Sequence, residues 1–108
     1  MNLTKESKKV LYVLYKEYEK RRKSGQSRSD SRFFSSASDI QSNFFPSIPL
    51  ADIEDSLREL GINGFLNNFY ADNTIYICNL SDYAIATMEE LPKDRFVSIT
   101  DFISKFIP

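Results

Sequence analysis

PLADIEDSLRELGINGFLNNFYADNTIYICNL, residues 49–80, is the stretch that decides the fold. Its first part begins with a proline, which suits the first turn of a helix, and then places apolar residues at helical spacing. These residues are Leu50, Ile53, Leu57 and Leu60. We therefore expect a helix from Pro49 to Leu60, ended by Gly61, with that stripe in the core. Two runs rich in aromatic and β-branched residues follow, 62–70 and 74–80, and the polar segment between them predicts a β-hairpin.

The residues before this stretch predict two more helices. The first covers residues 3–23, is capped by Thr4 or Asn2 and ends before Gly25. Its buried arc consists of Leu3, Ser7, Val10, Leu11, Leu14 and Tyr18. Residues 24–32 contain no apolar residue and predict a flexible, basic, Ser-rich loop, and residues 32–34 predict a very short strand. The second helix begins at Ser36 or Ser38, runs to about residue 43, and buries Ile40 and Phe44.

Two further helices are expected after the hairpin. The first begins at Ser81 or Asp82 and runs to Leu91, where Pro92 ends it. The second covers residues 98–107 and carries an apolar ridge close to the chain end, formed by Phe102, Ile103, Phe106 and Ile107. Two interpretations of this ridge remain open. It packs onto the first helix, or it forms the seam of a homodimer, since an exposed apolar ridge is unusual on a monomer.

Helix, short strand, helix, helix, hairpin and helix is an order that resembles the winged helix-turn-helix superfamily. The stretch IEDSLRELGI, residues 53–62, looks like the second helix of the DNA-reading pair, followed by a glycine and the start of the wing. The stretch LSDYAIATME, residues 80–89, is similar to the Leu-Thr-x-x-Gly-x-x-x-Leu motif that follows the wing in many small bacterial regulators, with Ala84 in place of the glycine. The layout resembles the small bacterial and phage type, including YjcQ-like proteins.

That resemblance implies an α+β fold: a single winged-helix domain over residues 1–108, with a β-hairpin wing and added C-terminal helices. It also implies a nucleic-acid-binding transcriptional regulator, or an accessory protein of a phage or mobile element; a homodimer would fit a regulator, because paired readers bind symmetric half-sites. In such folds the third helix enters the major groove of DNA. These are expectations from the resemblance. The composition and charge of the chain bear on them independently.

Composition argues against catalysis. The chain of 108 residues has one cysteine and no histidine, so it has neither a disulfide within the chain nor a His-based catalytic set or zinc site. Its three glycines form no phosphate-binding loop. We therefore expect no enzyme activity, no cofactor and no metal. The sequence also lacks an apolar run long enough to cross a bilayer and an N-terminal signal segment, which predicts a cytoplasmic protein without a membrane partner. Cys78, in an apolar strand, is expected in the core.

Charge is divided unevenly along the chain. Ten of the 14 lysines and arginines lie in residues 1–32 with four of the 15 acids, a net charge of +6, and residues 33–108 carry −7. Lys5, Lys9 and further lysines fall on the arc of the first helix opposite its buried stripe, with Tyr12 among them. A phosphate-contacting surface is one interpretation, and an ordinary solvated helix face is the other. The residues expected to bind nucleic acid are Lys16, Lys20, Arg21, Arg22, Lys23, Arg28 and Arg32.

The helix that corresponds to the DNA-reading helix carries mainly negative charge, the opposite of what contact with DNA requires. Arg58 is its only cation, and no lysine or arginine follows before Lys93, so the hairpin adds none. The solvent side of this helix is expected to carry Asp52, Asp55, Ser56 and Glu59. Carboxylates beside phosphates oppose DNA binding. Three interpretations remain: a merely solvated face, an acidic surface that docks a protein partner, or groove insertion in which a carboxylate reads cytosine.

Overall fold

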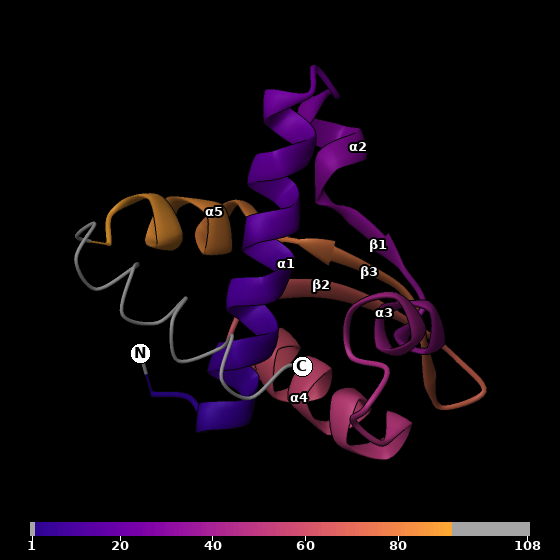
Figure 1. Cartoon of the computed structure of the whole chain (residues 1–108). Coiled ribbons are helices and arrows are strands. Elements are labelled where there is room, and N and C mark those ends of the chain that lie inside the picture. Colours follow the sequence, from indigo (N-terminus) through magenta and orange to yellow (C-terminus); the bar gives the residue numbers. More distant parts are fainter. Residues whose placement is uncertain (1, 92–108) are drawn as a thin grey trace.

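The computed structural model describes residues 2–91, and Figure 1 shows how they are arranged. This part of the chain contains five helices and three strands and belongs to the α+β class, as predicted. In chain order the elements are α1 (Lys5–Lys23), α2 (Arg28–Arg32), β1 (Phe33–Ser35), α3 (Ala37–Phe44), α4 (Leu50–Ile62), β2 (Leu66–Ala71), β3 (Thr74–Leu80) and α5 (Asp82–Glu89). The expected helix over residues 98–107, with its ridge of Phe102, Ile103, Phe106 and Ile107, lies outside the described residues.

The three strands form one antiparallel sheet in the order β1-β3-β2. The predicted hairpin is confirmed: Ala71 of β2 pairs with Thr74 of β3, so only two residues make the turn. Both turn residues have positive φ, 51° at Asp72 and 62° at Asn73. Asn and Asp tolerate that conformation, and a turn of this type matches the right-handed twist of the strands. The remaining strand, β1, pairs with the other edge of β3, so β3 is the central strand of the sheet.

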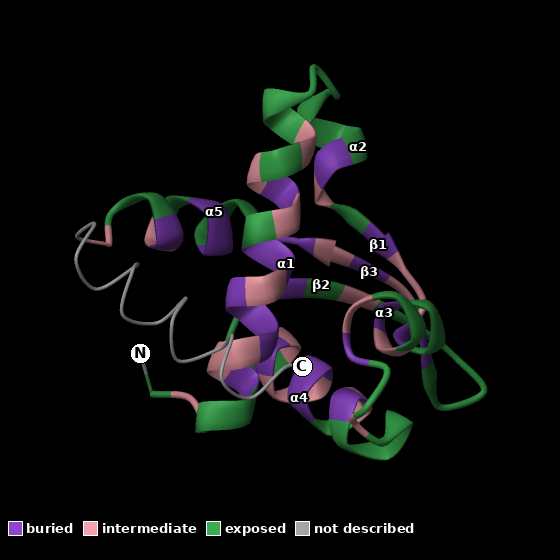
Figure 2. Cartoon of the chain, in the orientation of Figure 1, coloured by how far each residue is buried: buried purple, intermediate pink, exposed green. Residues whose placement is uncertain are grey.

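The core lies between one face of the sheet and the helices α1, α3 and α4. Figure 2 shows the buried residues along the strands and on the inward side of the helices. In α4 the buried side chains include Ile53, Leu57 and Leu60, and the strands contribute Leu66, Cys78 and Leu80 among others. The burial of Cys78 and of three of the four stripe residues, Ile53, Leu57 and Leu60, is therefore confirmed. Gly61 is part of α4 and does not end it, and a Cβ there would lie 2.6 Å from Nδ2 of Asn68, so the glycine permits α4 to approach β2 closely.

Two burial predictions, for Tyr12 and Leu50, are wrong, and the burial of Phe45 was not predicted. Tyr12, expected on the solvated arc of α1, is buried because α1 packs against both α4 and α2 and buries a wider arc than predicted, which also includes Tyr15. Leu50, expected in the core, is 41% exposed because it stands in the first turn of α4, at the edge of the packed region. Phe45, from the connection between α3 and α4, is fully buried, although nothing in the helical spacing marked it.

Predicted caps begin most of the helices. The side-chain oxygens of Thr4, Ser36 and Ser81 accept hydrogen bonds from backbone N–H groups in the first turns of α1, α3 and α5. The loop prediction for residues 24–32 is wrong in its second half, which forms α2. Ser27 caps this helix, and Ser31 is its buried residue. Apolar periodicity cannot reveal a five-residue helix whose only buried side chain is a serine.

Candidate nucleic-acid interface

The basic residues meet where α1 turns back into α2. Gly25 adopts a φ of 99°, and the backbone N–H groups of Gly25 and Gln26 donate to the carbonyls of Arg22 and Arg21. This left-handed turn ends α1 and sends the chain back alongside it, so α2 lies against the C-terminal half of α1 (Figure 1). The exposed cations of the two helices thus share one end of the molecule. We call them the basic cluster: Lys16, Lys20, Arg22, Lys23 and Arg28.

Arg21, expected to contact phosphate, serves the fold instead. Its Nη1 donates to the carbonyls of Phe33 (2.7 Å) and Ser31 (3.3 Å), and its Nε pairs with Glu17 at 3.2 Å. Its guanidinium also lies over the ring of Phe34, 4.6 Å from the centroid. One half-buried side chain therefore fastens α1 to α2 and β1. Arginine suits this role because its planar group donates in several directions and stacks on a ring at the same time.

Arg32 is also occupied within the fold. Its Nη2 is paired with a carboxylate oxygen of Asp82, which links the end of α2 to the first residue of α5. The hydrogen bond and the positive charge of Arg32 lower the pKa of Asp82, with a further small contribution from Arg28. Arg32 therefore contributes less positive field than an unpaired arginine, because its partner is a carboxylate.

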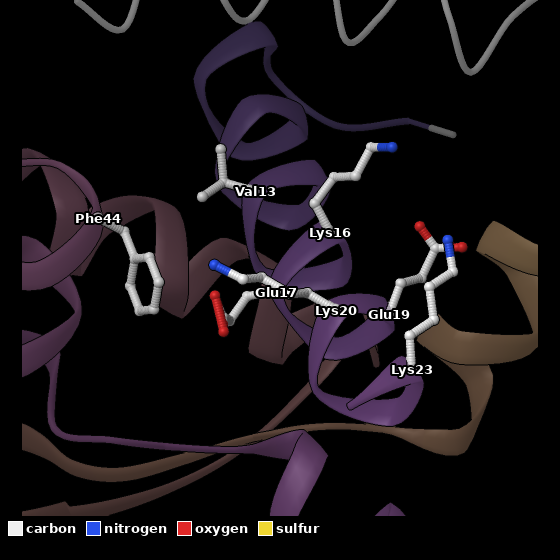
Figure 3. Close-up of a pocket in the computed structure, with 7 residues that line it drawn as sticks. All are labelled: Val13, Lys16, Glu17, Glu19, Lys20, Lys23 and Phe44. Atoms are coloured by element: carbon white, nitrogen blue, oxygen red, sulfur yellow. The ribbon is translucent and has the colours of Figure 1, made fainter. Parts of the chain in front are cut away.

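The cations that remain exposed are open to solvent and to ligands. Among residues 2–91, Lys20, Lys23 and Arg28 take part in no ion pair. Figure 3 shows an open hollow along α1, with Lys16, Lys20 and Lys23 around it and Phe44 of α3 facing it from the other side. Two carboxylates, Glu17 and Glu19, also line this hollow, and Glu17 is already paired with Arg21. Exposed lysines and arginines in such an arrangement attract polyanions.

The acidic side of α4 is smaller than expected. Asp52 and Asp55 are exposed as predicted, but Ser56 is only 5% exposed and faces the core. The carboxylate of Glu59 accepts hydrogen bonds from Oγ of Ser7 (2.6 Å), from Oγ1 of Thr4 (2.8 Å) and from the backbone N–H of Thr4 (2.9 Å). These bonds lower the pKa of Glu59, the bond from Ser7 being the largest cause. Glu59 thus fastens the start of α1 to α4, near the positive end of the α1 dipole.

The single cation of α4 is turned toward the hairpin. Arg58 donates to the carbonyl of Asn73, and its guanidinium lies 5.0 Å from the ring centroid of Tyr70. It therefore supports the hairpin turn and does not project from α4 as a free phosphate ligand. The exposed charge of α4 that remains is that of Asp52 and Asp55, with the half-buried Glu54 between them, and it is negative.

Sequence reasoning missed one surface altogether, the side of the sheet that faces away from the core. It carries Phe33, Asn67, Phe69, Ile77 and Asn79, which come from all three strands. Only the register between strands brings these residues together, since they are up to 46 positions apart in the chain. Alternation within each strand was the available signal, but it does not tell which strands are neighbours.

The described residues offer little other chemistry. Residues 2–91 contain no group of three or more side chains able to hold a metal ion. Burial raises the pKa of the Cys78 thiol to about 12, so at neutral pH it is protonated and a poor nucleophile. No helix in this range is long and apolar enough to span a membrane.

The chain matches no protein-family model, no curated protein and no solved structure.

Proposed function

We propose that this protein binds nucleic acid and has the winged-helix arrangement, with the basic cluster as its phosphate contact. The order of the described elements supports the arrangement: a long helix and a short strand precede two helices and a hairpin, and the sheet order is β1-β3-β2. In this proposal α3 and α4 correspond to the helical pair, and β2 and β3 correspond to the wing. The biological role that fits is a transcriptional regulator or an accessory protein of a mobile element.

One observation carries the proposal. The turn at Gly25 brings Arg28 of α2 beside the last turns of α1, where Lys20 and Lys23 are exposed and form no ion pair with other described residues. Affinity for nucleic acid comes largely from neutralising phosphates and releasing their counterions. An ordinary solvated face of α1 would not by itself require α2, which carries Arg28, to lie back against the same end of α1.

Insertion of α4 into a groove is not part of this proposal. Its exposed side offers Asp52 and Asp55, and Arg58 is held by the hairpin. Like charges beside phosphates repel, so α4 is expected to face away from the bound strand. The double variant Asp52→Lys/Asp55→Lys should therefore bind a duplex more tightly than the wild type, because it removes this long-range repulsion.

The decisive test is fluorescence anisotropy of a labelled random-sequence duplex at about 50 mM and about 200 mM salt, between which binding through several phosphates weakens by orders of magnitude. Lys20→Glu/Arg28→Glu should abolish binding at the lower salt. The matched control is Lys5→Glu/Lys8→Glu, which makes the same change in net charge in the first turn of α1, where acids suit the helix dipole. Equal binding by the two double variants refutes the proposal, as does a wild type that binds neither this duplex nor a single-stranded oligonucleotide.

A second candidate function is docking of a protein partner through α4 and the hairpin. The observation that favours it is Ile62, the last residue of α4, which is 86% exposed beside the exposed Phe69 and Tyr70. Aromatic and aliphatic side chains of this kind form the centres of protein interfaces. If the wild type binds no nucleic acid at low salt, Ile62→Asp becomes the variant with which a docking partner is tested.

A further inference from the structure

The sheet has a face that no described helix covers. Across its three strands, Phe33 of β1 pairs with Asn79 of β3, which pairs with Asn67 of β2. The next outward row holds Ile77 of β3 and Phe69 of β2. Residues adjacent to these in the strands, such as Leu66, Cys78 and Leu80, are buried on the opposite side. Because side chains alternate along a strand, the first five residues stand together on the outer face.

Two aromatic rings on this face are largely accessible. Phe33 is 45% exposed and Phe69 is 57% exposed, with Asn79 and Ile77 of β3 between them and Asn67 next to Phe69 on β2. A phenylalanine that packs within a small protein is normally buried, as Phe34, Phe45 and Phe65 are here. Phe33 and Phe69 lie two strand spacings apart across the sheet and one outward row apart along it, so their Cα atoms are about 12 Å apart.

The charge around this face is suited to a polyanion. None of its five residues is ionisable, and Arg32 lines a hollow together with Asn67, Phe69 and Asn79. The carboxylate of Asp82 near Arg32 is paired with it. The face also adjoins the basic cluster, because α2 runs directly into Phe33 and Arg21 holds the carbonyl of that residue.

We propose that the outer face of the sheet binds single-stranded nucleic acid. Two non-adjacent bases stack on Phe33 and Phe69, the amide of Asn79 hydrogen-bonds to a base edge between them, and the amide of Asn67 does so beside Phe69. The phosphates run toward Arg28 and the end of α1. Exposed aromatic rings on a sheet, polar side chains between them and cations at the border are the features that bind splayed bases. This inference rests on the proposed function and adds to it the form of nucleic acid that the protein prefers.

Two further points agree with this assignment, one about nucleic acids and one about this protein. A duplex cannot place its bases on a flat sheet, because they are stacked inside it, whereas the bases of a single strand are free to turn outward. In addition, the carboxylates of Asp52 and Asp55 lie on α4 and not among the five residues of the outer face. The acidic character of α4, which argues against groove binding, therefore does not oppose binding on the sheet.

The test measures anisotropy with a labelled oligothymidine of about 12 nucleotides, within the usual site size, and with a duplex of the same length. Phe33→Ser and Phe69→Ser should each weaken single-strand binding about tenfold and leave duplex binding unchanged, because a base–aromatic stack contributes about that much. Phe69→Tyr, which keeps a ring, should restore binding. Leu50→Ser removes an equally exposed apolar side chain on α4 and serves as the control for folding and non-specific effects. Repeating the titration with oligouridine decides between DNA and RNA, and a preference for either supports the proposal.

The outcomes separate this inference from the function on which it rests. If the phenylalanine variants bind the single strand like the wild type while Lys20→Glu/Arg28→Glu does not, the protein binds phosphates only and the inference fails. If neither nucleic acid binds the wild type, both proposals fail. If the wild type self-associates in sedimentation experiments and Phe69→Ser abolishes that association, the face is an interface between two copies, which also overturns the inference.

Discussion

Replacing Arg21 by alanine most sharply separates the cations that support the fold from those proposed to bind a ligand. The change removes two hydrogen bonds from a charged donor to the carbonyls of Phe33 and Ser31, and the cation–π contact with Phe34. Hydrogen bonds to charged groups contribute about 1.5 to 3 kcal/mol, and a cation–π contact at an exposed site about 0.5 to 1 kcal/mol. Nη1 serves both carbonyls and the side chain is 22% exposed, so we count the two bonds as one. The free energy of unfolding should fall by about 2 to 4 kcal/mol.

The assay is urea unfolding followed by circular dichroism, with Arg28→Ala as the matched control. Arg28 is exposed and forms no ion pair among residues 2–91, so its replacement should change the free energy of unfolding by less than about 0.5 kcal/mol. Nucleic-acid binding should show the opposite order, with Arg28→Ala weakening it at temperatures where both variants are folded. The reasoning is refuted if Arg21→Ala is as stable as the control, because the contacts around Arg21 would then contribute nothing.

Three more predictions concern stability and reactivity. The fold lowers the pKa of Glu59, so its carboxylate stabilises the protein above its unfolded pKa of about 4.3, and this stabilisation is lost as the pH falls through the lower folded value. Glu59→Gln should therefore make the free energy of unfolding depend less on pH in the acidic range, as measured by urea unfolding between neutral and acidic pH. Cys78 should react with a thiol reagent only at the rate of unfolding, and fast labelling of the native protein would show that its thiol is accessible. Gly25→Ala should destabilise the protein by about 1 to 2 kcal/mol in thermal unfolding, because φ is 99° at this residue, even though a Cβ there would touch nothing within 4 Å. An unchanged unfolding midpoint would mean that the turn relaxes to accept the side chain.

The cations of this protein fall into two groups. Arg21, Arg32 and Arg58 each hold two segments of the fold together, whereas Lys20, Lys23 and Arg28 hold none among the described residues. A net charge of +6 over residues 1–32 therefore overstates the charge that a ligand meets. Charge-reversal scans that treat all seven predicted residues alike would mix loss of folding with loss of binding.

The sequence by itself determined the features that depend on neighbours within one or two turns. Thr4, Ser36 and Ser81 cap helices because their side chains reach a backbone N–H three residues ahead, and the turn at residues 72–73 follows from two residues that tolerate positive φ. The stripe of Ile53, Leu57 and Leu60 follows from helical periodicity. Such signals are contained in the local chain, so they can be predicted from it.

Only the tertiary structure decided what the charged and aromatic residues do. Glu59 belongs to an acidic pattern in the sequence, yet it is bound to Thr4 and Ser7 more than 50 residues away. The same holds for Arg21 at the carbonyl of Phe33, and for Phe33 and Phe69, which only strand order brings onto one face. A long side chain makes the same local pattern whether it meets solvent or a partner from a distant segment. Its role is therefore settled by packing geometry, which local periodicity does not contain.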